Sequence, residues 1–117
     1  MTYANVALIA VPTANKEKYM ELATSMAEFF KSMGALEVAE CWGVDVPDGK
    51  LTSFPMAVQL KADETVVCSW IKWPSKEAGD AAFAKMESGG ASLPGSHDMP
   101  FDGARMIFGG FEMILEA

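Results

Sequence analysis

The sequence is poor in the residues that bind metals: it has one histidine and two cysteines among 117 residues. These three residues stand at long spacing and match no zinc-binding pattern, so neither a metal nor a cofactor is predicted. Basic residues are also few, nine against sixteen acidic ones, and the formal net charge is −7. Such a surface repels the phosphates of nucleic acids and anionic membranes, which argues against a nucleic-acid-binding protein.

Long apolar runs are missing as well. No run approaches the roughly 18 residues that a membrane-spanning helix needs, and Met1 to Asn5 lacks the basic and apolar regions of a signal peptide. We therefore expect a cytoplasmic protein in which Cys41 and Cys68 are reduced, and burial would make both thiols inert. The sequence contains no Ser-His-Asp elbow, phosphate-binding glycine loop or dinucleotide fingerprint.

Half of the residues are hydrophobic and about a fifth are charged, as in a globular protein, and the length predicts a single domain over residues 1–117. The longest β-branched and aromatic run, residues 64–73, predicts a strand that ends at Pro74. Both alternating sets of its side chains are largely apolar, which indicates a central strand with protein on both faces.

Three more strands are predicted, over residues 3–11, 35–44 and 105–115. Gly109-Gly110 in the last strand indicates a bulge or a close backbone approach. A helix capped by Thr13 or Asn15 follows the first strand and ends at Gly34. Its apolar stripe is formed by Tyr19, Leu22, Met26, Phe29 and Met33.

A second long helix is predicted to begin at the cap Ser75 and to end at Gly89-Gly90, before a loop over residues 91–98. Between the second and third strands, Ser53 and Pro55 favour a short helix, with a strand as the alternative.

The order β-α-β, long connection, β-α-β is typical of an α+β, ferredoxin-like split βαβ fold. It has a four-stranded antiparallel sheet with two helices on one face. The strand positions of opposite parity are also apolar: Ala7, Ile9, Cys68, Trp70, Phe111 and Met113. Because two helices cover only one face of such a sheet, we expect the other face to be buried in a homodimer.

Three stretches carry a family resemblance: residues 40–50 (ECWGVDVPDGK), 63–76 (DETVVCSWIKWPSK) and 98–112 (DMPFDGARMIFGGFE). Together with residues 3–16, they resemble the YbaA-like domain-of-unknown-function family of bacteria. The resemblance implies membership of the dimeric α/β-barrel superfamily, in which two ferredoxin-like sheets pack face to face. Residues 88–97 do not align with the family pattern, and the family implies no established activity.

Two tryptophans are the main candidates for a binding site. Trp42 and Trp70 lie on strands predicted to be neighbours and would wall a pocket for a flat apolar ligand; the alternative is that they fill the core or the dimer interface. Glu40 shares a strand face with Trp42. Among apolar groups its pKa would rise and it would act as a proton acceptor, while a solvated edge position is the alternative.

The remaining candidates lie near the last strand. Arg105 would clamp a ligand carboxylate together with Asp102, unless the two residues only form a turn and a local ion pair. His97, next to Asp98, would serve acid–base chemistry or a metal site, and a solvated loop is the alternative.

These observations predict a cytoplasmic homodimer that holds a small apolar or aromatic metabolite in a pocket between sheet and helices, without a membrane or nucleic-acid partner. The alternative is a small monooxygenase-like enzyme of the same superfamily, either cofactor-independent or haem-linked. This alternative rests on analogy of fold. Haem-degrading members of the superfamily use a tryptophan and a histidine, and His97 lies outside the stretches that resemble the family.

Overall fold

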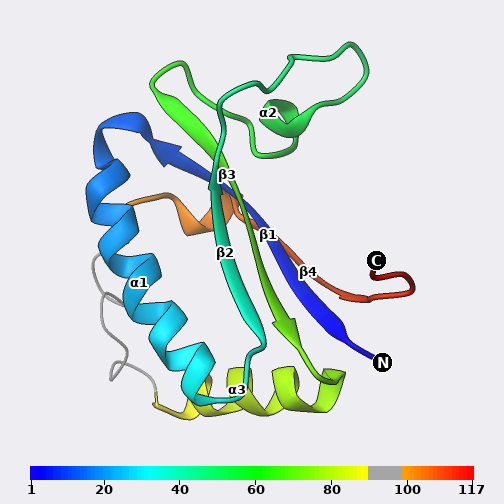
Figure 1. The fold of residues 1–117 in the computed structure, drawn as a ribbon. Helices are drawn as coiled ribbons and strands as arrows, with labels where there is room; N and C mark the ends of the chain where they lie inside the picture. Colours follow the sequence, from blue (N-terminus) through cyan, green and yellow to red (C-terminus); the bar gives the residue numbers. More distant parts are fainter. Residues whose placement is uncertain (90–98) are drawn as a thin grey trace.

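The computed structural model describes residues 1–89 and 99–117 (Figure 1). Its elements are β1 (Tyr3–Pro12), a 3-10 turn (Thr13–Asn15), α1 (Lys16–Ser32), β2 (Glu37–Trp42), α2 (Phe54–Ala57), β3 (Glu64–Trp73), α3 (Lys76–Gly89), a second 3-10 turn (Gly103–Arg105) and β4 (Ile107–Glu112). The predicted order of strands and long helices is confirmed. The predicted loop over residues 91–98, which contains His97, lies outside the described residues.

The four strands form one antiparallel sheet in the order β2-β3-β1-β4. The two most apolar strands, β1 and β3, are therefore the central pair, as their sequences predict. They run side by side from Tyr3 opposite Trp73 to Pro12 opposite Glu64. This strand order, with α1 after β1 and α3 after β3, is the ferredoxin-like split βαβ arrangement.

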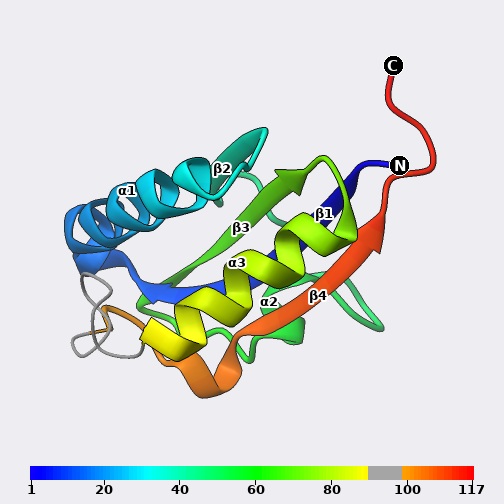
Figure 2. The same ribbon diagram turned by 90° about the horizontal axis from the view of Figure 1, so that it is seen from below.

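Both long helices lie on the same face of the sheet (Figure 2). The core on this face includes Trp73, which is fully buried against Phe30 of α1 and Ala82 of α3. The indole Nε1 of Trp73 donates a 2.8 Å hydrogen bond to Oδ1 of Asn5, so the one buried polar residue in the middle of β1 has a partner. A Cβ on Gly79 would lie 3.0 Å from this indole, which explains a glycine inside α3.

The other face of the sheet is covered at one end only. The connection between β2 and β3 folds over it, so that Val58 packs against Ala10 and Val66. The connection contains α2, where the Ser53 hydroxyl accepts a 3.1 Å hydrogen bond from the amide of Met56. This confirms the short helix as the correct alternative. Beyond α2 the face stays open, and the side chain of Phe111 is 57% exposed.

The predicted grouping of apolar residues on the open face is partly wrong. Ala7 and Ile9 belong to the core under α1, whereas Cys68 faces the other way. The reason is the register: residues directly opposite in an antiparallel pair share a face, and Val6 and Leu8 lie opposite Trp70 and Cys68. The open face nevertheless remains apolar, with Val6, Leu8, Trp70 and Phe111.

Several element ends also differ from the prediction. The last strand begins at Ile107 because Gly103–Arg105 forms a 3-10 turn, and it ends at Glu112, so Met113 lies outside it. The Asn15 side chain makes no capping hydrogen bond to α1, and its Nδ2 donates to the carbonyl of Pro100 at 3.1 Å.

The glycines of β4 mark a close approach. The register of β1 with β4 runs without a bulge through Gly109 and Gly110, and a Cβ on Gly110 would overlap the phenol of Tyr3. Of the two predicted explanations for these glycines, the structure therefore confirms the close approach.

Candidate functional site

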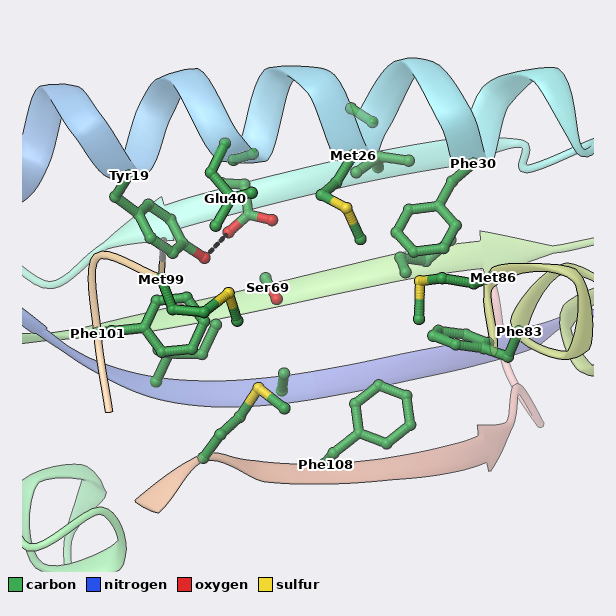
Figure 3. A pocket seen from close by; sticks show the side chains of 18 of the residues that line it. Tyr19, Met26, Phe30, Glu40, Ser69, Phe83, Met86, Met99, Phe101 and Phe108 are labelled. Atoms are coloured by element: carbon green, nitrogen blue, oxygen red, sulfur yellow. Dashed lines mark hydrogen bonds between the residues drawn. The ribbon is translucent and has the colours of Figure 1, made fainter. Parts of the chain in front are cut away.

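A cavity of about 360 Å³ lies between the helices and the sheet (Figure 3). Nine of the nineteen described lining residues are aromatic or sulfur-containing: Tyr19, Phe30, Phe83, Phe101, Phe108, Met26, Met86, Met99 and Met106. These side chains come from both helices, from β4 and from the residues that lead into it. The volume lies within the range of small-molecule sites, which are mostly apolar with a few polar groups.

Small residues keep the cavity open. Ala23 and Ala27 lie one turn apart on α1, and both line the cavity above Ala7 of β1. A methyl group at each of these positions does not reach across the space between helix and sheet. Tyr19, Met26 and Phe30 continue the same helix face at steps of three and four, so α1 supplies a wall of large side chains around a middle of small ones.

Three polar residues, Tyr19, Glu40 and Ser69, are grouped in this mostly apolar wall. The Tyr19 hydroxyl donates a 2.6 Å hydrogen bond to Oε1 of Glu40. Ser69 of β3 lies directly opposite Glu40 of β2 in the sheet register, so both side chains are on the helix-covered face. Figure 3 shows Tyr19, Glu40 and Ser69 side by side at the cavity.

Burial decides the ionisation of this group. The pKa of Glu40 is raised, because its carboxyl loses hydration among apolar neighbours, and the hydrogen bond from Tyr19 only partly opposes the rise. The pKa of Tyr19 is also raised, first by burial and then by the adjacent Glu40 carboxylate. Tyr19 thus stays a neutral donor, and Glu40 is a carboxylate that readily accepts a proton or a hydrogen bond.

The five residues predicted from the sequence do not come together. Glu40 lines the cavity, and Trp42 lies farther along the same strand face, where Lys16 Nζ is 5.2 Å from the ring centroid. Trp70 faces away from the cavity, since it lies opposite Ala39 while Trp42 lies opposite Val67. The hypothesis that both tryptophans wall one pocket is therefore wrong.

Arg105 and Asp102 form a structural cluster, the alternative that the sequence left open. The Arg105 guanidinium binds both carboxylate oxygens of Glu64, at 2.8 and 2.5 Å, and Oδ2 of Asp102 at 3.0 Å. It also donates to the carbonyl of Gln59 at 3.0 Å. These bonds join the turn before β4 to the connection around α2, and they occupy the donors that a ligand carboxylate would need.

Tyr19 and Ser69 are site residues that sequence reasoning missed. Tyr19 was assigned only to the apolar stripe of the first helix, although its hydroxyl requires a partner wherever the ring is buried. Ser69 carries no signal of its own in the sequence of β3. The signal that points to it is the strand register, because pairing residues 37–42 with 67–72 places Ser69 opposite Glu40.

The described residues contain neither a cluster of metal ligands nor a membrane-spanning helix. In residues 1–89 and 99–117, no three His, Cys, Asp or Glu side chains are grouped so that they could hold a metal ion. Within the same residues no helix has the length and apolar character required to cross a membrane.

Comparison with known proteins shows that this chain is similar to proteins of unknown function. Residues 2–103 match the family model "Protein of unknown function (DUF1428)". The chain is 50% identical over 116 residues to the uncharacterized protein YbaA of Escherichia coli K12, and the match covers 99% of both proteins. The YbaA protein of Shigella flexneri matches to the same extent.

A solved structure shares the fold. A protein from an uncultured marine organism, described as a dimeric ferredoxin-like protein, superimposes with a TM-score of 0.66 at 11% sequence identity. The match covers 99% of this chain and 98% of that one. At this identity the likeness supports the ferredoxin-like fold and nothing beyond it.

Proposed function

The chain belongs to the DUF1428 family of proteins of unknown function, and we propose that it binds a small apolar or aromatic metabolite in the cavity between sheet and helices. The observation that carries the proposal is a cavity of about 360 Å³ whose mostly apolar wall contains few polar side chains, among them the grouped Tyr19, Glu40 and Ser69. A ligand that fills the cavity removes the apolar wall from water, which favours binding by about 25 cal/mol per Å² of apolar surface.

A cavity-filling substitution tests this proposal. Ala27→Leu places a larger side chain in the cavity and should abolish ligand binding without unfolding α1, since leucine is a good helix former. Thr24→Leu adds a similar side chain at an exposed position of the same helix and should leave binding unchanged. Native mass spectrometry of freshly purified protein measures the bound molecule. The proposal fails if wild type carries none and binds no member of a panel of apolar metabolites.

We also propose that the open sheet face is the interface of a homodimer. Ile107 and Phe111 are 42% and 57% exposed on this face, next to the half-buried Val6 and Trp70. A second copy would bury this apolar surface, and the similar solved protein is described as dimeric. A dimer of this kind joins two sheets face to face, as the resemblance to the dimeric α/β-barrel superfamily implies.

Sedimentation velocity at micromolar concentration tests the interface. Wild type should sediment as a dimer, and Phe111→Glu should sediment as a folded monomer because a charge replaces an apolar contact. Met20→Glu is the matched control, since Met20 is 51% exposed on α1, away from the open face. A monomeric wild type contradicts the interface but leaves the cavity proposal standing.

A small monooxygenase-like enzyme is the second candidate, and the position of Glu40 favours it. A carboxylate with a raised pKa at an apolar cavity is suited to take a proton from a bound substrate. The cofactor-independent form of this chemistry needs such a base, whereas the haem-linked form would depend on His97, outside the described residues. Oxygen uptake with quinol-like substrates, measured for wild type and Glu40→Gln, distinguishes turnover from binding alone.

A further inference from the structure

The charges around the cavity have one sign. Two carboxylate side chains line it, Glu40 from β2 and Glu87 from α3. None of the lining residues in the described part of the chain is a lysine or an arginine. Lys16 does not line the cavity, and its Nζ lies 5.2 Å from the centroid of the Trp42 ring. Among these described lining residues, no positive side chain balances the negative charge of Glu40 and Glu87.

Within the described residues, only one of the two carboxylate oxygens of Glu40 accepts a hydrogen bond. Oε1 accepts the hydrogen bond from Tyr19, and among the described residues no donor reaches Oε2. Ser69, opposite Glu40 in the register, adds a hydroxyl oxygen at the same place on the cavity wall. Together they offer two acceptors to a group that carries several N–H donors, as an ammonium does.

The surrounding rings suit a cation as well. Tyr19 and Phe101 lie edge to face with centroids 5.8 Å apart, beside the carboxylate. The faces of aromatic rings attract organic cations, and the attraction grows where water is excluded. An anionic ligand, in contrast, would face Glu40 and Glu87 together in a protein whose net charge is already −7.

We propose that the ligand of this cavity is a protonated amine with an apolar or aromatic body, whose ammonium group binds between Glu40 and Ser69. The inference rests on the proposed function, and it adds the chemical class of the ligand. The apolar body lies along the methionines and phenyl rings of the cavity, and the ammonium supplies the positive charge that the wall lacks. Because a charge-assisted hydrogen bond is about twice as strong as a neutral one, the amine should be preferred over an alcohol of the same shape.

Three probes with one apolar body test the proposal: naphthylmethylamine, naphthylmethanol and naphthoate, titrated by isothermal calorimetry near neutral pH. We expect the amine to bind at least about tenfold more tightly than the alcohol, and the carboxylate to bind most weakly. In Glu40→Gln the preference for the amine should disappear while the alcohol still binds. Ser69→Ala should weaken the amine more than the alcohol.

Glu37→Gln is the matched control. Glu37 lies on the same strand as Glu40 but faces the other side of the sheet, opposite Lys72. The Glu37→Gln variant loses the same charge as Glu40→Gln, so it should keep the full preference for the amine. If the amine and the alcohol bind equally to wild type, or if the preference survives in Glu40→Gln, the amine proposal is wrong and apolar binding stands. If none of the three probes binds, the amine proposal is also wrong, and the panel of apolar metabolites then decides separately whether the proposed function fails.

Discussion

Glu40 and Glu64 lie on neighbouring strands of one sheet, and their surroundings differ in the partner that each carboxylate has. Glu64 is bound through both oxygens by Arg105, and the two side chains are only 5% and 15% exposed. Glu40 has a neutral partner, the Tyr19 hydroxyl, and faces a cavity. The pKa of Glu64 is lowered to about 2, mainly by the hydrogen bonds from Arg105, whereas burial raises the pKa of Glu40.

The difference separates a carboxylate that stabilises the fold from one that is available to a ligand. Because both oxygens of the Glu64 carboxylate are bound by Arg105, this ion pair has no free carboxylate oxygen for another molecule. A partly buried carboxylate without a cation costs stability, and carboxylates with pKa values perturbed in this way cluster at functional sites. Four measurements test the comparison, beginning with the largest expected effect.

Removing the guanidinium should cause the greatest loss of stability. Arg105→Met leaves the Glu64 carboxylate buried without its cation, and we expect a loss of about 3–5 kcal/mol in the free energy of unfolding. Urea denaturation measures it. Arg105→Lys keeps the charge but loses the bidentate hydrogen bonding to Glu64, so the loss of unfolding free energy should be intermediate. A loss below about 1 kcal/mol for Arg105→Met would show that the pair is not structural.

Acid should remove the same stabilisation. The pKa of Glu64 is about 2 in the folded protein against an ordinary value of 4.5, so its contribution is complete above pH 4.5 and is lost as the pH falls toward 2. The shift corresponds to about 3 kcal/mol. Unfolding free energies between pH 6 and pH 2 should therefore decline more steeply for wild type than for Glu64→Gln. Parallel curves for the two proteins would contradict the assignment.

Glu40 should behave in the opposite way. Its raised pKa means that the folded protein holds the proton more tightly than the unfolded chain, so this group lowers stability as the pH rises through its pKa. Glu40→Gln should stabilise the protein at neutral pH, by less than about 1 kcal/mol because part of the residue is exposed. Thermal unfolding measures the gain, and a clear loss of stability would refute it.

An exposed ion pair should give the smallest change in the free energy of unfolding. Lys76 and Asp80 lie one turn apart on α3 at 2.7 Å, with side chains 61% and 58% exposed. Lys76→Met should change the free energy of unfolding less than any of the variants above, because water and salt screen the pair. A change comparable to that of Arg105→Met would mean that burial does not explain the contrast.

The sequence predicts the fold because the signals for it are local. The run from Glu64 to Trp73 is a strand over the predicted residues, and Ser53 and Ser75 act as the predicted helix caps. The apolar excess on the open face is also correctly anticipated, although two residues were assigned to it wrongly. Alternation along one strand separates its residues into two sets. It does not show which set of the neighbouring strand lies on the same face of the sheet, because that depends on the register.

The lack of information on register and helix packing also explains why the sequence reveals only part of the site. Glu40 was identified from its own strand, but Ser69 is defined by register and Tyr19 by how α1 packs on the sheet. Both are tertiary relations that no spacing within one element contains. Tryptophan suggested a ligand wall because of its size, yet the cavity exists where the residues are small, at Ala7, Ala23 and Ala27.

The most direct test of the account is the titration of every glutamate carboxyl by ¹³C NMR, with and without naphthylmethylamine. We expect Glu40 to titrate above the ordinary value of 4.5 in the free protein and Glu64 to titrate near 2, and we expect the amine to lower the pKa of Glu40 alone. A Glu40 that titrates at or below 4.5, and that the amine does not move, would contradict it.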